Sequence, residues 1–133
     1  MNQLERLILQ IGKENVEKIK NTVVAIIGLG GVGGYALESI TRSGIGTIII
    51  IDNDIIDITN LNRQLISTHQ NIGQSKVDAW EERIKMINPD CKVIKIKEFI
   101  TKDNFPIIFQ NKINYFIDAC DTVSTKKEII KEC

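Results

Sequence analysis

The chain has 133 residues, of which 43% are apolar and 26% charged, and its 17 basic and 17 acidic residues balance to a formal net charge of zero. This composition predicts one folded domain and excludes intrinsic disorder, because the branched apolar residues are numerous enough to form a core. No apolar run approaches the roughly 18 residues of a membrane span. The balanced charge argues against a general nucleic-acid-binding protein, although it leaves room for a small basic patch.

The N-terminus and the cysteines predict a cytoplasmic protein. The first residues lack a basic segment followed by a long apolar one, so they do not resemble a signal peptide. Cys91, Cys120 and Cys133 are odd in number and form no CxxC pair, so neither a disulfide framework nor a zinc site is expected within this chain. We expect reduced, mostly buried thiols.

Apolar periodicity predicts the secondary structure in chain order. Two short helices come first, strands and helices then alternate, and a polar connection of residues 53–73 follows the second strand. The expected strands are Thr22–Ile27, Thr47–Ile51, Lys92–Lys97 and Tyr115–Ala119. The expected helices are residues 3–11, 14–20, 32–43, 74–87 and 103–110, and a last one from Thr122 onward. Because the chain ends inside that last helix, we expect it to be part of a longer protein.

This alternation predicts an α/β fold: a Rossmann-like, mainly parallel sheet with helices on both faces, preceded by an N-terminal helical segment. The alternating residues of Lys92–Lys97 are typical of an edge strand. In such sheets ligands bind at the carboxyl ends of the strands. The polar connection starts at this edge, and loops of its length are usually either functional or disordered.

A glycine-rich turn follows the first predicted strand. Residues 28–33, Gly-Leu-Gly-Gly-Val-Gly, match G-x-G-x-x-G between a strand and a helix, where glycines let the backbone approach a phosphate and the helix supplies free N–H groups. Asp52 closes the second strand, where a carboxylate can accept both ribose hydroxyls. The pattern favours nucleotide binding and leaves NAD and ATP both open.

Two cations in the following segment favour a triphosphate. Lys76 falls in the first turn of its predicted helix, where a cation opposes the helix dipole at a cost of about 0.3–1 kcal/mol. Such a cost suggests that Lys76 faces an anion, and with Arg63 it could clamp a triphosphate, which NAD does not need. The alternative is that both are solvated loop charges.

Two carboxylates, Asp118 and Asp121, flank the end of the last predicted strand. Mg²⁺ is commonly held by one or two carboxylates together with phosphates, and Asp121 is the better-placed candidate of the two. The alternative is that Asp121 caps the following helix.

Together, the segments GLGGVG, Asp52-Asn53-Asp54, NLNRQ, IGQSK, INP and DACD resemble the HesA/MoeB/ThiF family, also called the ubiquitin-activating-enzyme-like family. The resemblance runs from Arg6 to the end of the chain. It implies that residues 1–133 are the N-terminal, ATP-binding part of an adenylating enzyme whose C-terminal part is absent. Such enzymes bind ATP and Mg²⁺ and adenylate a carboxylate, releasing pyrophosphate.

The resemblance also implies a role for each matching residue. Glycines would hold the nucleotide phosphates, Asp52 the ribose and Asp121 the Mg²⁺, with Asp54 close by. Arg6 would reach across a homodimer interface to the ATP of the partner. The residues implied to bind ATP are Gly28, Gly30, Gly31, Gly33, Asp52, Asp54, Asn60, Arg63, Gln64 and Lys76, and those implied to act in catalysis are Arg6, Arg63, Lys76 and Asp121.

Within the family, residues 42–46, 82–89 and 118–133 are most similar to the bacterial tRNA-modifying branch. The resemblance implies that ATP activates the carboxylate of a threonylcarbamoyl group on tRNA adenosine 37, which then closes into a ring with net loss of water. One alternative is an adenylyltransferase for a ubiquitin-like sulfur-carrier protein. Others are an NAD-dependent oxidoreductase domain, and a folded half without activity of its own.

Overall fold

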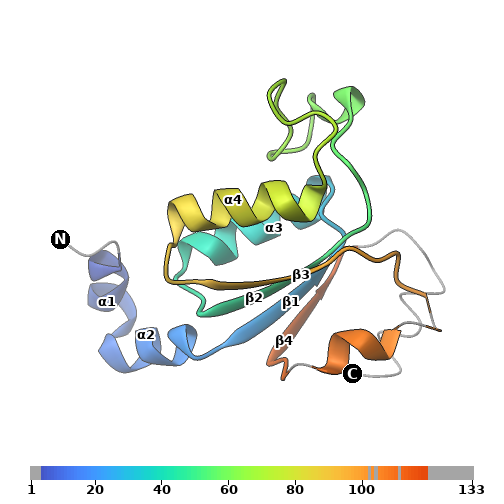
Figure 1. The fold of residues 1–133 in the computed structure, drawn as a ribbon. Coiled ribbons are helices and arrows are strands. Elements are labelled where there is room, and N and C mark those ends of the chain that lie inside the picture. Colours follow the sequence, from blue (N-terminus) through green and yellow to red (C-terminus); the bar gives the residue numbers. More distant parts are fainter. Residues whose placement is uncertain (1–3, 102, 104, 111, 120–133) are drawn as a thin grey trace.

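The computed structural model describes residues 4–101, 103, 105–110 and 112–119 (Figure 1). Every element expected in that part of the chain is present, and its boundaries lie within two residues of the predicted ones. In chain order they are α1 (Glu5–Ile11), α2 (Lys13–Lys20), β1 (Val23–Ile27), α3 (Gly31–Arg42), β2 (Thr47–Ile51), the 3₁₀ helix η1 (Ile58–Asn60), α4 (Lys76–Ile87), β3 (Lys92–Ile96), the 3₁₀ helix η2 (Phe105–Gln110) and β4 (Tyr115–Asp118). The helix expected from Thr122 onward lies outside the described residues.

The four strands form one parallel sheet in the order β3-β2-β1-β4. The chain therefore winds outward from β1 to β3 and then returns to the other side of β1, which is the Rossmann arrangement. This confirms the predicted fold class, and β3 lies at the edge where its alternating pattern placed it. The point at which the winding reverses lies between β1 and β4, where such sheets bind ligands beside the carboxyl ends of the strands.

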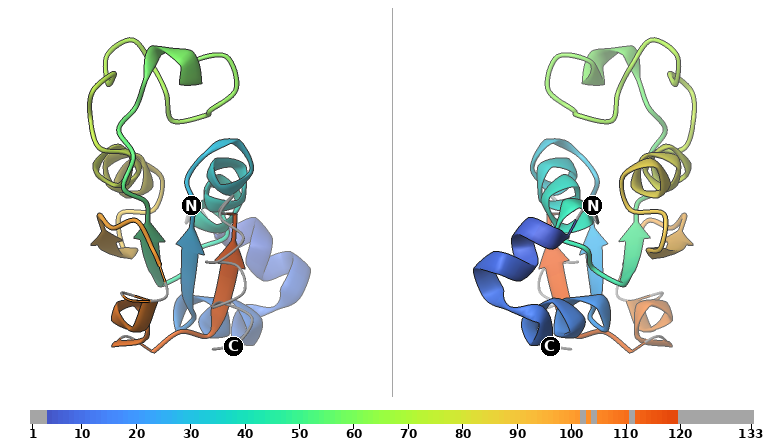
Figure 2. Two further views of the ribbon diagram at one scale, coloured as in Figure 1. Left: turned by 90° about the vertical axis from the view of Figure 1, so that its right-hand side faces the viewer. Right: turned by 90° about the vertical axis from the view of Figure 1, so that its left-hand side faces the viewer.

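Both faces of the sheet are covered because its central strands are apolar on both sides. In β2 all four isoleucines are buried. Ile48 and Ile50 pack under α3 and α4, while Ile49 and Ile51 face the opposite side. There the sheet is covered by Ile100 and by Ile108 of η2 (Figures 1 and 2).

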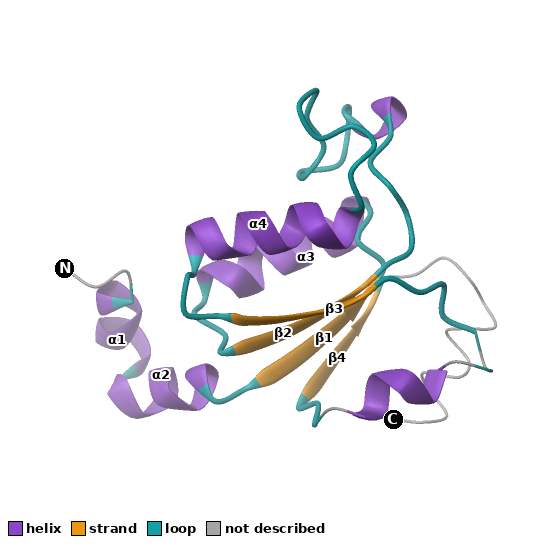
Figure 3. Cartoon of the chain, viewed as in Figure 1, coloured by secondary structure: helices purple, strands orange, loops and turns teal. Residues whose placement is uncertain are grey.

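The polar connection between β2 and α4 is folded rather than disordered. Ile56 N donates to Gln74 O at 2.8 Å and Gly73 N donates to Ile56 O at 2.8 Å, so the two ends of the connection pair with each other. Ile56 and Ile66 are buried in the core cluster on the α4 side. This segment, residues 53–73, projects above the carboxyl edge of the sheet (Figure 3), and we call it the excursion.

The N-terminal helices lie at the opposite end of the molecule. α1 and α2 sit beside the amino ends of the strands (Figure 1), and the Leu4 side chain packs at Gly44. No helix in the described part of the chain is long and apolar enough to cross a membrane.

The cysteine expectation holds for Cys91, whose thiol is buried and not part of a disulfide. Removal from water raises the pKa of this thiol, which keeps it protonated. Cys120 and Cys133 lie outside the described residues.

A charged pair joins α3 to α4. Arg83 Nε and Nη2 donate to Glu38 Oε1 and Oε2, each at 2.7 Å. Arg42 donates to Oε2 from the same helix as Glu38, at 3.0 and 3.1 Å. The hydrogen bonds from Arg83 hold the pKa of Glu38 below its ordinary value of 4.5, against the opposing effect of partial burial, and Arg42 adds to the lowering.

We predict that Glu38→Gln lowers the free energy of unfolding by roughly 1–3 kcal/mol at pH 7, because bonds to a charged acceptor are lost. A depressed carboxyl pKa stabilises the fold above the ordinary pKa, and this contribution disappears as the pH falls through the folded-state pKa. The difference between wild type and variant should therefore shrink below about pH 4.5. Urea unfolding at several pH values measures it, and a difference that stayed constant down to pH 3 would contradict this account.

Candidate functional site

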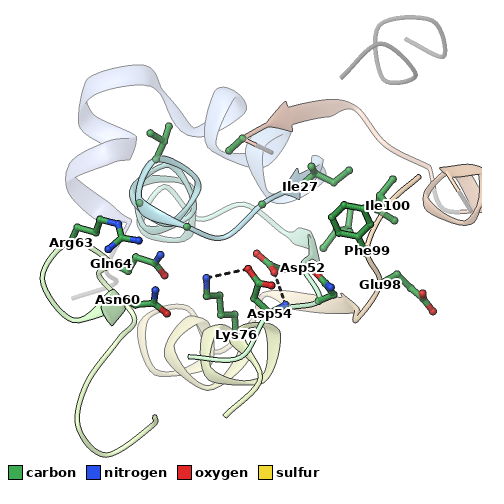
Figure 4. A pocket seen from close by; sticks show the side chains of 17 residues that line it. Ile27, Asp52, Asp54, Asn60, Arg63, Gln64, Lys76, Glu98, Phe99 and Ile100 are labelled. Carbon is green, nitrogen blue, oxygen red and sulfur yellow. Dashed lines mark hydrogen bonds and ion pairs between the residues drawn. The ribbon is translucent and has the colours of Figure 1, made fainter. Parts of the chain in front are cut away.

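A pocket of about 630 Å³ opens at the carboxyl edge of the sheet (Figure 4). Every strand contributes residues that follow its last position, and the excursion and the start of α4 close the remaining side. The lining residues are Ile27, Gly28, Gly30, Gly31, Val32, Ile51, Asp52, Asn53, Asp54, Asn60, Arg63, Gln64, Lys76, Glu98, Phe99, Ile100 and Ala119.

The glycine turn bends sharply from β1 into α3. Gly28 has φ +86°, a left-handed conformation that glycine adopts without strain. Gly33 does not line the pocket. A Cβ on it would stand 1.8 Å from Gly28 O and 3.1 Å from the Ala119 side chain. Gly33 therefore lets α3 start directly beneath the turn, and the first N–H groups of that helix have no partners inside it.

Asp52 ties the turn to the end of β2. Its Oδ2 accepts from Leu29 N at 2.7 Å, and its Oδ1 accepts from Asp54 N at 2.8 Å. Both oxygens thus hold backbone from different segments. Because a carboxylate oxygen can accept two hydrogen bonds, each retains capacity for a ligand hydroxyl.

Lys76 is not a solvated loop charge. It is the first residue of α4, and its side chain is only 5% exposed. Among the described residues, the one carboxylate within 4 Å of its Nζ is that of Asp54, 3.7 Å away and itself 63% exposed. A buried ammonium at a helix N-terminus is disfavoured both by lost hydration and by the helix dipole. This site therefore has a strong physical preference for an added anion.

The excursion supplies three polar residues to the same wall. Asn60 is buried and its Oδ1 accepts from Asp57 N at 2.8 Å, which shapes the turn. Gln64 is also buried and lies over Gly30, and its Oε1 has no hydrogen-bond partner among the described residues. An unpaired buried polar atom costs about 1–3 kcal/mol, so this wall suits a polar ligand.

Arg63 differs from Lys76 because it is exposed. Its Nη1 donates to Thr59 O at 2.9 Å and to Asn62 Oδ1 at 3.1 Å. These two bonds fix the guanidinium at the rim of the pocket and leave its other N–H groups for a ligand.

The end of the pocket away from the excursion is more apolar. Phe99 and Ile100 follow β3 and lie beside Ile27 at this end (Figure 4). Sequence reasoning did not identify these residues or Glu98. A signal was available, because they directly follow a predicted strand and therefore lie at the edge where ligands bind.

Nine of the predicted site residues line this pocket: Gly28, Gly30, Gly31, Asp52, Asp54, Asn60, Arg63, Gln64 and Lys76. Arg6 belongs to α1, at the far end of the sheet (Figure 1), so the structure does not place it at this chain's own pocket. Asp121 lies outside the described residues, and the described part of the chain holds no cluster of three or more metal-ligating side chains.

Comparison with known proteins identifies one family. The ThiF family profile matches residues 4–133. The tRNA threonylcarbamoyladenosine dehydratase of Bacillus subtilis is 46% identical over 133 residues, which cover all of this chain and 52% of that protein. The crystal structure of the Escherichia coli tRNA N6-threonylcarbamoyladenosine dehydratase in complex with ATP superimposes with a TM-score of 0.95 at 34% identity, covering 98% of this chain and 54% of the other.

A more distant relative comes from another branch. The adenylyltransferase and sulfurtransferase of Vanderwaltozyma polyspora is 37% identical over 115 residues, which cover 86% of this chain and 26% of that protein. The chain thus spans about half the length of the dehydratases it matches, or less. The alternative of an NAD-dependent oxidoreductase finds no support among these relatives.

We predict that Gly33→Ala lowers the free energy of unfolding by about 3 kcal/mol or more, because the new methyl group would overlap the Gly28 carbonyl and force the backbone apart. Gly31→Ala is the matched control, since a Cβ there would stand 3.9 Å from the nearest atom, Arg63 O. It should change stability by no more than about 1 kcal/mol. Chemical unfolding of both variants measures the effect, and equal stability of the two would refute the steric account.

Proposed function

Because the chain belongs to the ThiF family, we propose that residues 1–133 form the ATP-binding domain of an enzyme that activates a carboxylate by adenylation. The observation that carries the proposal is the buried ammonium of Lys76 on the polar wall of a pocket at the strand ends. The relative crystallised with ATP has the same fold over nearly the whole of this chain.

We propose that ATP lies along the pocket from its apolar to its polar end. The base lies against Phe99 and Ile100, and the ribose hydroxyls bond to Asp52. The phosphates lie over the glycine turn and are bound by Asn60, Arg63, Gln64 and Lys76, with Asp54 orienting the Lys76 ammonium. Apolar contacts at the base and charge-assisted bonds at the phosphates support this direction.

In the proposed reaction a carboxylate oxygen of the substrate bonds to the α-phosphorus of ATP. The bond between that phosphorus and the bridging oxygen breaks, and pyrophosphate leaves with the electron pair. Negative charge grows on the leaving group, where Lys76 and Arg63 stabilise it more strongly in the transition state than in bound ATP.

Mg²⁺ is part of the proposal, with Asp121 as its protein ligand. The described carboxylates at positions 52 and 54 have other roles in this proposal, since Asp52 holds backbone N–H groups and the ribose hydroxyls and Asp54 faces Lys76. A cation held by one further carboxylate and by phosphate oxygens fits the usual habit of Mg²⁺, and it would neutralise phosphate charge. The test is to measure how much Mg²⁺ increases the affinity for ATP in wild type and in Asp121→Asn. If the increase is as large in the variant as in wild type, Asp121 does not hold the Mg²⁺.

The substrate we propose is the threonylcarbamoyl group of a tRNA adenosine, with the reaction taking place in the cytoplasm. An atom of the carbamoyl group then attacks the carbonyl carbon of the adenylate and loses its proton, and AMP leaves with the former carboxylate oxygen. The ring that forms differs from the starting nucleoside by the loss of water. Identity of 46% with a tRNA threonylcarbamoyladenosine dehydratase over the whole chain supports this substrate. A ubiquitin-like sulfur-carrier protein is the second candidate, supported by the adenylyltransferase and sulfurtransferase relative.

We further propose a homodimer in which Arg6 of one protomer reaches the ATP of the other. The place of α1 at the amino ends of the strands supports this, because Arg6 lies in α1, at the opposite end of the sheet from the pocket of the same chain (Figure 1). A protein that sedimented as a monomer at high concentration would contradict this role for Arg6.

We predict that Lys76→Gln raises the Kd for ATP by about tenfold to a hundredfold, because a charge-assisted bond is worth roughly 1.5–3 kcal/mol. Lys18→Gln, on the exposed face of α2, is the matched control and should bind like wild type. Isothermal titration measures both. Wild-type protein that bound NADH tightly and failed to bind ATP would overturn the proposed function.

We predict that the full chain, incubated with ATP and tRNA carrying threonylcarbamoyladenosine, releases pyrophosphate, and that unmodified tRNA gives no release because it lacks the carboxylate. A coupled pyrophosphate assay measures the rate. Release with a sulfur-carrier protein and none with modified tRNA would favour the second candidate. ATP binding without release on either substrate would indicate a half that lacks its catalytic complement.

A further inference from the structure

We infer that the pair of Glu38 and Arg83, which we call the interhelical pair, is a positioning device that sets the two helical arms of the pocket against each other. This inference rests on the proposed function, because it concerns how phosphates are held. Neither residue lines the pocket or is among the predicted site residues. Both would therefore affect ligand binding only through the positions of the pocket residues Gly31 and Lys76.

The pair lies at the same distance from the pocket along both helices. α3 and α4 run side by side in the same direction, each with its N-terminus at the carboxyl edge of the sheet (Figures 1 and 2). Their first residues, Gly31 and Lys76, both line the pocket. Glu38 and Arg83 each follow their helix's first residue by seven positions, a rise of about 10.5 Å or two turns. Any sliding of one helix along the other therefore changes the separation of Gly31 and Lys76.

Apolar packing between the two helices is less directional than hydrogen bonding, so it defines their register less sharply. The Trp80 ring of α4 packs beside Gly34 of α3, and its Cζ2 would stand 3.3 Å from a Cβ at Gly34. Contacts of this kind are non-directional, and a flat ring against a glycine offers little resistance to sliding. Among the described residues, no hydrogen bond or ion pair other than those of Glu38 and Arg83 joins α3 to α4.

The geometry of the pair supplies the missing direction. Two parallel N–H···O bonds of 2.7 Å join a planar guanidinium to a planar carboxylate, so they fix both the distance and the relative orientation of the groups. Both side chains are largely withdrawn from solvent, at 14% exposure for Glu38 and 31% for Arg83. Arg42 also bonds to Glu38 from within α3, with a side chain 59% exposed. It provides a control that removes a cation from Glu38 without cutting the link between helices.

The test compares Arg83→Gln, Arg83→Lys and Arg42→Gln with wild type in the full chain. Titration with ATP in magnesium-containing buffer measures the affinity for the whole nucleotide. Titration with adenosine measures the affinity for the base and ribose alone, without the phosphates. For Arg83→Gln we expect a Kd for ATP about tenfold higher and a Kd for adenosine within about twofold of wild type. Arg83→Lys keeps the charge but loses the fork geometry, so its Kd for ATP should rise about two- to fivefold. Arg42→Gln should bind both ligands like wild type.

The outcomes separate the two claims. If wild type binds ATP and Arg83→Gln binds it equally well, the positioning role is wrong and the proposed function stands. The positioning role is also wrong if Arg83→Gln loses affinity for ATP and for adenosine equally, because that pattern indicates a general loosening of the fold. If Arg83→Gln does not fold, Arg83→Lys decides by the same comparison. Failure of wild type to bind ATP would overturn the proposed function and this inference with it.

Discussion

The pocket depends on one carboxylate that holds backbone from two segments. Asp52 receives Leu29 N on one oxygen and Asp54 N on the other, and Asp54 in turn is the residue that faces Lys76. Asp52 thereby joins the glycine turn to the end of β2, and Asp54 continues the link to the start of α4. Because hydrogen bonds to a carboxylate are short and strong, the two bonds of Asp52 hold the glycine turn against the end of β2 before any ligand enters.

The fold was largely predictable because its signals are local. Four buried isoleucines in Thr47–Ile51 define a strand covered on both faces, and G-x-G-x-x-G after Ile27 defines the turn into a helix. The alternation of strands and helices then leaves few topologies, since parallel crossovers are nearly always right-handed. Even the edge position of β3 follows from lysines alternating with apolar residues in its sequence.

The state of the site residues was less predictable because it depends on distant parts of the chain. The place of Lys76 in the first turn of a helix suggested that it faces an anion, but it did not show that the side chain is buried, because burial depends on residues distant in the sequence. Phe99 was missed because a single aromatic after a strand has no spacing signature. Arg6 came only from the family resemblance, and it does not line the described pocket. Asp121 was proposed from its place after the last predicted strand, and it lies outside the described residues.

The strand order has a consequence for how the molecule is assembled. β1 and β4 are neighbours, yet Val23 N bonds to Asn114 Oδ1 across a sequence separation of 91 residues. Closing a loop of that length costs about 1 kcal/mol more in entropy than closing the shorter β1–β2 crossover, and contacts between residues so far apart in sequence tend to form slowly. We therefore expect the three-stranded part to form early and β4 to dock late. Ala119, which follows β4, lines the pocket, so a ligand that fits the finished pocket would also stabilise the last step of folding.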